Sequence, residues 1–171
     1  MSKIDDIKAQ VSGLEDLLER KPRVLVVDDD SDVVELTKTV LEMCGYEVLS
    51  EPNTNTAAEN YITGKYGEVD IILADYNNKN ASKDIQGGLT LLTAINASET
   101  PPTLFVGMSG QYAPIYETKC DLFYVKPFRT FDLVSEITDE CLRKITTNYG
   151  EPEIIIAATS YSGINAATPA K

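Results

Sequence analysis

The chain has 171 residues, of which 43% are hydrophobic and 25% are charged, a composition typical of a soluble globular protein with one domain and short appendages. Its 15 basic and 27 acidic residues give a net charge of −12, which disfavours nucleic acid as a partner because such binding depends on basic side chains. The absence of histidine excludes a Ser-His-Asp triad, a histidine metal ligand and a role as phosphohistidine donor.

The cysteines and the first residues bear on the compartment. Cys44, Cys120 and Cys141 are odd in number and widely spaced, as expected of reduced and mostly buried thiols. The start of the chain lacks the basic and then apolar layout of a signal peptide, and every apolar stretch is too short to span a bilayer. We therefore expect a cytoplasmic protein without membrane insertion.

Residues 1–21 predict an amphipathic N-terminal helix that ends before Pro22. Its apolar residues follow heptad spacing: Ile4, Ile7, Val11, Leu14 and Leu18. Two interpretations stay open. The helix packs on its own domain, or it dimerises with the same helix of a second copy.

Strands and helices alternate through residues 22–148. The segments predicted as strands are Val24–Val27, Glu47–Ser50, Val69–Ala74, Thr103–Met108 and Leu122–Val125. Helices are predicted between and after these strands. The first begins with a cap at Asp30 or Ser31 and ends at Gly45, and the second begins with a capping box over Thr56–Glu59 and ends near Gly64. A short apolar helix follows over Leu89–Asn96, then one or two helical turns within Gln111–Thr118, and a last helix that is capped by Thr130 and ends near Thr147.

This alternation predicts an α/β fold with three layers, a doubly wound parallel sheet covered by helices on both faces. Residues 149–171 depart from the pattern, and we expect a partly flexible tail there, although Ile154–Ile156 could add an edge strand.

Five reactive side chains follow the ends of predicted strands: Asp28, Asp29, Asp75, Ser109 and Lys126. Ligands bind at this edge in open α/β sheets. The carboxylates suit Mg²⁺, and a carboxylate can also accept a phosphoryl group while an ammonium group neutralises its oxygens. Each motif alone has an ordinary explanation as a helix cap, a turn or a loop. Their conjunction at successive strand ends favours a functional site.

At these positions the chain resembles a response regulator receiver domain, the phosphoryl-accepting part of two-component signalling systems. The resemblance covers about residues 23–147 and rests on the motifs VLVVDDD, IILAD, FVGMS and YVKPF. It implies a flavodoxin-like sheet of five parallel strands in the order 2-1-3-4-5.

The resemblance also implies roles for individual residues. Asp75 corresponds to the phosphoacceptor, and Lys126 to the lysine beside it. Asp28 and Asp29 correspond to the acidic pair that, with Asp75 and the backbone carbonyl of Asn77, holds Mg²⁺.

Further positions correspond to the family's switch and tuning residues. Ser109 matches the switch hydroxyl, Phe123 the switch aromatic residue, and Pro127 a proline usually joined by a cis bond. Asn77 and Gln111 fall where receivers vary the residues that tune dephosphorylation.

Two stretches depart from the family pattern. The polar run Tyr76–Gly87 indicates an insertion after the phosphoacceptor, and the short stretch between Ser109 and Lys126 predicts a truncated fourth helix.

We therefore expect a stand-alone receiver that takes a phosphoryl group from a histidine kinase or histidine phosphotransfer protein and then switches its surface for a downstream protein partner. It would catalyse only its own phosphorylation and dephosphorylation. One alternative is a degenerate receiver that acts as an unphosphorylated binding module. The other is a haloacid-dehalogenase-like phosphatase using Asp28 as nucleophile and Asp30 as acid, but this alternative leaves Asp75 unexplained.

Overall fold

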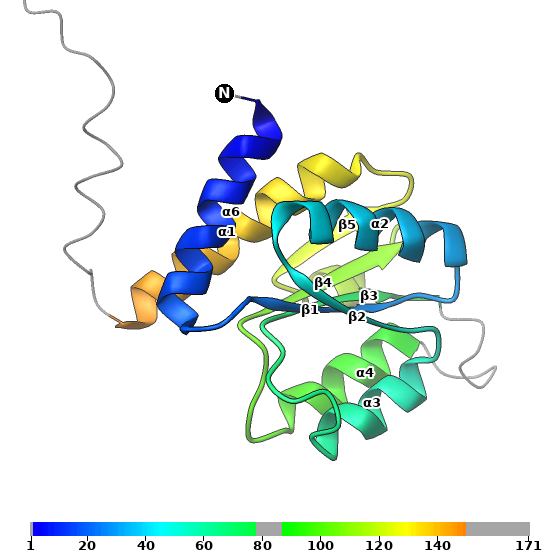
Figure 1. Cartoon of the computed structure of the whole chain (residues 1–171). Helices are drawn as coiled ribbons and strands as arrows, with labels where there is room; N and C mark the ends of the chain where they lie inside the picture. Colours follow the sequence, from blue (N-terminus) through cyan, green and yellow to red (C-terminus); the bar gives the residue numbers. More distant parts are fainter. Residues whose placement is uncertain (1, 78–86, 150–171) are drawn as a thin grey trace, which may run out of the picture.

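Five parallel strands form one sheet between two layers of helices in the computed structural model, which describes residues 2–77 and 87–149 (Figure 1). The strands are β1 (Arg23–Val27), β2 (Glu47–Glu51), β3 (Ile71–Asp75), β4 (Leu104–Ser109) and β5 (Leu122–Val125). Their order is β2-β1-β3-β4-β5, which confirms the predicted topology.

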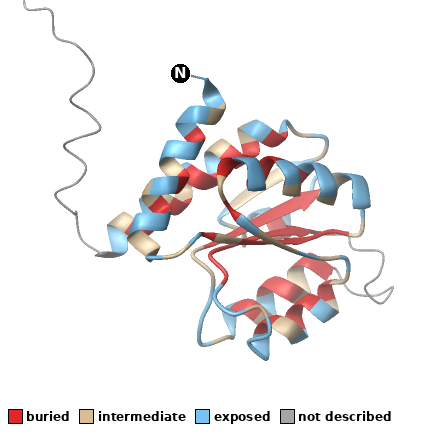
Figure 2. Cartoon of the chain, in the orientation of Figure 1, coloured by how far each residue is buried: buried red, intermediate tan, exposed pale blue. Residues whose placement is uncertain are grey.

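The helices divide between the two faces of the sheet (Figure 1). On one face lie α1 (Lys3–Leu18), α2 (Ser31–Cys44) and α6 (Thr130–Tyr149), and on the other lie α3 (Thr54–Ile62), α4 (Gly87–Asn96) and the short α5 (Pro114–Glu117). Strand residues alternate between the two cores, so Val24 and Val26 face the first and Leu25 and Val27 the second. The central strands are therefore buried on both sides (Figure 2).

The observed starts of three helices, α2, α3 and α6, can be compared with the starts predicted from the sequence. Asp30 caps α2, since its side chain accepts hydrogen bonds from the backbone N–H groups of Asp32 and Val33. The capping box predicted at Thr56 is wrong, because Asn53 caps α3 by accepting from Asn55 and Thr56. An asparagine is a strong N-cap and lies earlier in the chain, so the helix begins before the threonine. Thr130 is the first residue of α6.

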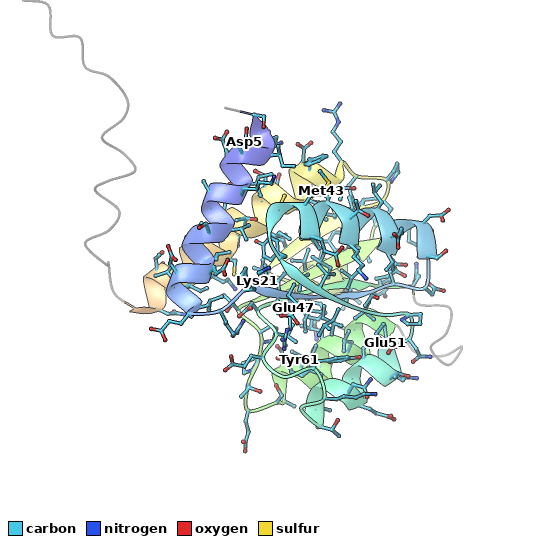
Figure 3. All side chains as sticks on the ribbon, viewed as in Figure 1. Asp5, Lys21, Met43, Glu47, Glu51 and Tyr61 are labelled. Atoms are coloured by element: carbon cyan, nitrogen blue, oxygen red, sulfur yellow. The ribbon has the colours of Figure 1, made fainter. Side chains whose placement is uncertain are left out.

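Helix α1 packs on its own domain. A capping box between Ser2 and Asp5 begins the helix, and its buried residues Ile7, Val11 and Leu14 lie in the same core as α2 and α6. Figure 3 labels Asp5 in the first turn of this helix. Lys3 pairs with Asp132 of α6, and Gln10 Nε2 donates to Asp139 at 2.5 Å. Most of the heptad stripe is therefore covered within one chain, and dimerisation through this helix would have to use its other face.

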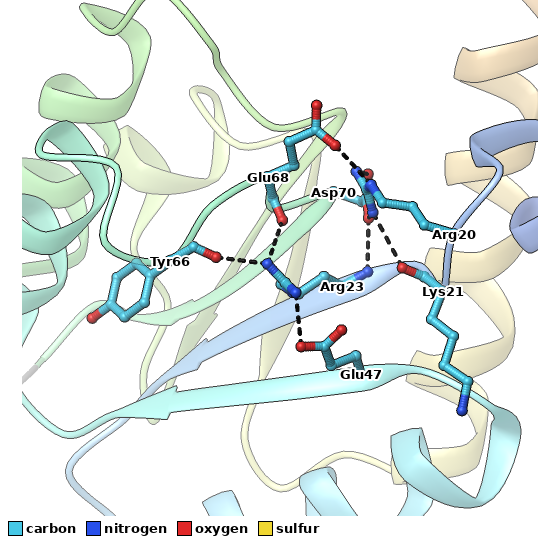
Figure 4. Close-up of polar contacts among 7 residues, drawn as sticks. All are labelled: Arg20, Lys21, Arg23, Glu47, Tyr66, Glu68 and Asp70. Carbon is cyan, nitrogen blue, oxygen red and sulfur yellow. Dashed lines mark hydrogen bonds and ion pairs between the residues drawn. The ribbon is translucent and has the colours of Figure 1, made fainter.

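A polar cluster holds the end of α1 against the start of β3 (Figure 4). The Arg20 guanidinium donates to both carboxylate oxygens of Asp70, at 2.7 and 2.9 Å, and to Glu68 at 2.7 Å. The backbone N–H of Arg23 also donates to Asp70, at 2.7 Å. The hydrogen bond to Asp70 raises the pKa of Arg20, so the guanidinium group stays charged.

Several predictions fall at the margins of the described chain. The helix between Ser109 and Lys126, which was predicted to be truncated, is α5, and its four residues confirm the prediction. Most of the predicted insertion and the whole segment 150–171, with Ile154–Ile156, lie outside the described residues. In the ranges 2–77 and 87–149 we find no helix with the length and apolar character needed to cross a membrane.

Candidate functional site

Three carboxylates converge where β1 and β3 end. Asp28 and Asp29 follow β1, and Asp75 is the last residue of β3, which pairs with β1 in a register that places Val27 beside Ala74. One oxygen from each carboxylate lies within 4.8 Å of the others. Asp28 is 1% exposed and Asp75 4% exposed, while Asp29 is half-buried. The structure thus brings together the three acidic residues that the sequence selected.

Lys126 joins this acidic cluster from β5, on the far side of β4. Its Nζ atom lies 2.6 Å from Oδ2 of Asp28 and 3.1 Å from Oδ1 of Asp75. Burial opposes the charged ammonium group, but the hydrogen bond to Asp28 and the charge of Asp75 outweigh burial and raise the pKa of Lys126. Among the described residues, the ammonium group of Lys126 therefore pairs with two of the three carboxylates, Asp28 and Asp75.

Asp75, the candidate phosphoacceptor, is a weaker acid than an ordinary aspartic acid side chain. Burial and the neighbouring charge of Asp28 raise the pKa of Asp75 to about 6, although Lys126 acts in the opposite direction. Carboxylates this close destabilise one another until a cation neutralises them. The cluster is consequently suited to bind a cation rather than to remain bare.

The donor set fits a small, hard divalent ion. Mg²⁺ prefers oxygen ligands, keeps several waters and requires only one or two carboxylates. Asp28 is already oriented, since its Oδ1 accepts from the backbone N–H of Asp30 at 2.9 Å. Asn77 is exposed two residues after Asp75, and the role of its carbonyl as a ligand stays a prediction.

Ser109 lies at the same edge, at the end of β4. Its side chain is fully buried, and its Oγ accepts from the backbone N–H of Gln111 at 3.2 Å. Its carbonyl accepts from the backbone N–H of Lys126 at 2.8 Å, which ties the ends of β4 and β5 together. The peptide bond between Lys126 and Pro127 is cis, as the resemblance implied.

An aromatic cluster lies beneath this edge on the α3–α4 face. Phe123, the predicted switch residue, is half-buried and contacts Tyr116 edge-on, with ring centroids 5.9 Å apart. Tyr116 is fully buried, and its hydroxyl donates to the carbonyl of Ala74, the residue before Asp75, at 2.8 Å. Tyr116 was not among the functional residues predicted from the sequence. Its signal was the pair of small residues Ala74 and Gly107, which leave space on neighbouring strands.

Open hollows flank the carboxylates. One, of about 240 Å³, is lined by Asp28, Asp29, Ser31, Val34, Glu35, Ser50, Glu51 and Pro52. The other, of about 260 Å³, is lined by Asp30, Val33, Leu36, Thr37, Lys126, Pro127, Phe128 and Thr130. Asp28 and Asp29 therefore border the first hollow, and Lys126 borders the second.

No family model matches the chain. Among curated proteins it is similar to the transcriptional regulatory protein PrrA of Mycobacterium tuberculosis, with 29% identity over 139 residues, covering 78% of this chain and 56% of PrrA. The nisin biosynthesis regulatory protein NisR of Lactococcus lactis is 30% identical over 118 residues, covering 67% of this chain and 48% of NisR. The chain spans about half the length of these relatives.

Solved structures share the fold. A CheY-like response regulator receiver domain from Methanospirillum hungatei superposes with a TM-score of 0.61 at 21% identity, covering 75% of this chain and 98% of that one. A response regulator from Burkholderia pseudomallei, whose structure contains a phosphorylated aspartic acid and a calcium ion, gives a TM-score of 0.52 at 16% identity, covering 70% and 72% of the two chains.

Proposed function

This chain contains a domain of the response regulator receiver type, and we propose that it accepts a phosphoryl group on Asp75 and relays signals by switching a protein-binding surface. The observation that carries the proposal is the convergence of Lys126, Asp28 and Asp75, with the ammonium group 2.6 and 3.1 Å from the two carboxylates. The related fold that holds a phosphorylated aspartic acid and a calcium ion supports this assignment.

The proposed transfer is a displacement at phosphorus. A carboxylate oxygen of Asp75 forms a bond to phosphorus while the bond from phosphorus to the donor nitrogen breaks, and the donor, which carries a proton on its other ring nitrogen, leaves as a neutral imidazole. Because the chain has no histidine, the phosphohistidine must belong to a partner, either a histidine kinase or a histidine phosphotransfer protein. Lys126 neutralises charge on the transferred group and orients Asp75.

Asp28 and Asp29, together with Asp75, would hold Mg²⁺, which when bound neutralises charge on the phosphoryl oxygens. Lys126 keeps the two buried carboxylates of this cluster, Asp28 and Asp75, in place. Ser109, buried at the next strand end, would turn its hydroxyl from Gln111 toward the phosphoryl group. We propose no reaction on an external substrate beyond this self-phosphorylation and its reversal.

Incubation of the purified chain with acetyl phosphate and Mg²⁺, followed by intact mass measurement, tests the proposal. The wild type should gain one phosphoryl group, and Asp75→Asn or removal of Mg²⁺ with a chelator should prevent the gain. A wild type that gains nothing would support a degenerate receiver instead. A gain that persists in Asp75→Asn but disappears in Asp28→Asn would support the phosphatase alternative.

A further inference from the structure

Tyr116 is a buried polar side chain that the proposed phosphoryl transfer does not use. It comes from the four-residue helix α5, yet its ring and hydroxyl reach beneath the sheet and are fully buried. Burial raises the pKa of Tyr116 well above its usual value, so the hydroxyl is protonated and donates to the Ala74 carbonyl at 2.8 Å. The acceptor of this hydrogen bond therefore belongs to the residue directly before Asp75.

The space for Tyr116 is built into the sheet. Ala74, Gly107 and Phe123 lie side by side on β3, β4 and β5. The first two are small, so they leave a hollow next to the Phe123 ring. A Cβ atom on Gly107 would lie 2.7 Å from Cε1 of Tyr116, closer than side chains tolerate. The hollow therefore fits the tyrosine ring and requires glycine.

Helix α4 closes the same space from the other side. A Cβ atom on Gly88 would lie 2.6 Å from the Tyr116 hydroxyl and 2.8 Å from the carbonyl oxygen of Asp75. The start of α4, the end of β3 and the tyrosine hydroxyl thus meet at one point. Movement of the hydroxyl would change the support of Asp75 directly.

The Tyr116 ring also fills the space beside the predicted switch residue. Its centroid lies 5.0 Å from that of Tyr76 and 6.2 Å from that of Phe105, and Phe123 meets it nearly perpendicular, at 88°. Phe123 could turn inward only after Tyr116 had left. An inward turn of Phe123, the residue that matches the family's switch aromatic position, is therefore blocked in this conformation.

We propose that Tyr116 is a positioning residue, whose hydroxyl holds the Ala74–Asp75 end of β3 in place for phosphoryl transfer. Its ring fills the buried space beside Gly107 of β4 and Phe123 of β5. This inference deepens the proposed function and rests on it for the identity of the reacting group. The sequence-based expectation, by contrast, selected Phe123 as the aromatic residue of the switch and did not include Tyr116.

Tyr116→Phe tests the inference because it removes the hydroxyl and keeps the ring. Tyr112→Phe is the matched control, since Tyr112 lies in the same segment and is 70% exposed. Phosphorylation of Asp75 is measured over a range of acetyl phosphate concentrations, well below the melting temperature of every variant. Because a displacement of about 1 Å in a reacting group can cost on the order of 100-fold in rate, Tyr116→Phe should lower the rate at saturating donor by about tenfold or more. Tyr112→Phe should keep the wild-type rate.

A second readout, independent of phosphorylation, is the Mg²⁺ concentration that gives half of the full rise in melting temperature. Groups that orient metal ligands typically contribute about 10-fold or more in metal affinity, so this concentration should rise about tenfold in Tyr116→Phe and stay constant in Tyr112→Phe. If Tyr116→Phe matches the wild type in rate and in Mg²⁺ response, the inference is overturned and the proposed function stands. If the wild type is not phosphorylated, the proposed function fails, and the Mg²⁺ response alone decides for or against the positioning role.

Discussion

The Nζ atom of Lys126 lies 2.6 Å from Oδ2 of Asp28, although the two residues are 98 positions apart in the sequence. Asp28 follows β1 and Lys126 follows β5, and both β3 and β4 lie between these strands in the sheet. The lysine therefore spans the carboxyl edge and neutralises part of the charge of a cluster that burial alone would make unfavourable.

Lys126→Gln should weaken both phosphorylation and the fold. The substitution leaves Asp28 and Asp75 without their ammonium partner, so we expect a loss of about 3–5 kcal/mol in the free energy of unfolding at neutral pH. The rate of phosphorylation should fall by about 100-fold or more. Urea unfolding in the absence of metal measures the first effect. Lys38→Gln, which breaks an exposed ion pair with Glu42, is the control and should cost less than about 1 kcal/mol. Equal losses in the two variants would contradict the role of Lys126.

The raised pKa of Asp75 predicts a pH dependence of stability. The pKa rises from 3.8 to about 6, so the folded state holds the proton more tightly than the unfolded state. The carboxyl group of Asp75 therefore adds to the free energy of unfolding, and this contribution is fully present below about pH 4 and is lost as the pH rises through about 6. This difference in pKa between the folded and unfolded states corresponds to about 3 kcal/mol in the free energy of unfolding.

Asp75→Asn cannot ionise and should therefore unfold at a higher urea concentration than the wild type at pH 7.5 without metal, with the gap closing at acid pH. Asp132→Asn serves as the comparison, because its exposed carboxylate has a pKa lowered by Lys3 and should show no such gain. A metal-free Asp75→Asn protein less stable than the wild type at pH 7.5 would speak against the strained carboxylate cluster.

Millimolar Mg²⁺ should raise the melting temperature by several degrees, because an ion that binds only the folded state stabilises it. Asp29→Asn removes one of the three clustered carboxylates and should reduce the rise. Asp30→Asn is a close control, since an asparagine can keep the cap of α2 and Asp30 is not part of the cluster. An unchanged melting temperature in Mg²⁺ would count against a formed metal site.

Leu14→Ala should destabilise the monomer by about 2–5 kcal/mol, because Leu14 of α1 is completely buried in the core shared with α2 and α6. Leu36→Ala, at a position 57% exposed, should change stability by less than about 1 kcal/mol. The unfolding midpoint should not depend on protein concentration. A midpoint that rises with concentration would indicate that α1 pairs with a second copy.

The strand ends were predictable from the sequence for a physical reason. Parallel strands place their carboxyl ends at one edge, so residues that directly follow apolar runs must lie close together, as Asp28, Asp75 and Lys126 do. Helix starts were less predictable. Asn53 and Thr56 are both good caps, and the local sequence does not say which of them leaves the helical conformation.

Two features depended on contacts between distant residues. The heptad pattern in α1 suits its own domain or a second chain equally well, and only the folded structure shows that α1 packs against α6 of its own domain. The burial of Tyr116 follows from Gly88 of α4 and Gly107 of β4, which both come close to the tyrosine side chain only in the folded protein.

The most direct test of the central claim is the identity of the residue that carries the phosphoryl group. The chain is treated with acetyl phosphate and Mg²⁺, the acyl phosphate is reduced with borohydride, and the modified residue is located by mass spectrometry of peptides. We predict that the modification lies on Asp75. Modification of Asp28, or of no residue while the wild type is folded and binds Mg²⁺, would contradict the account.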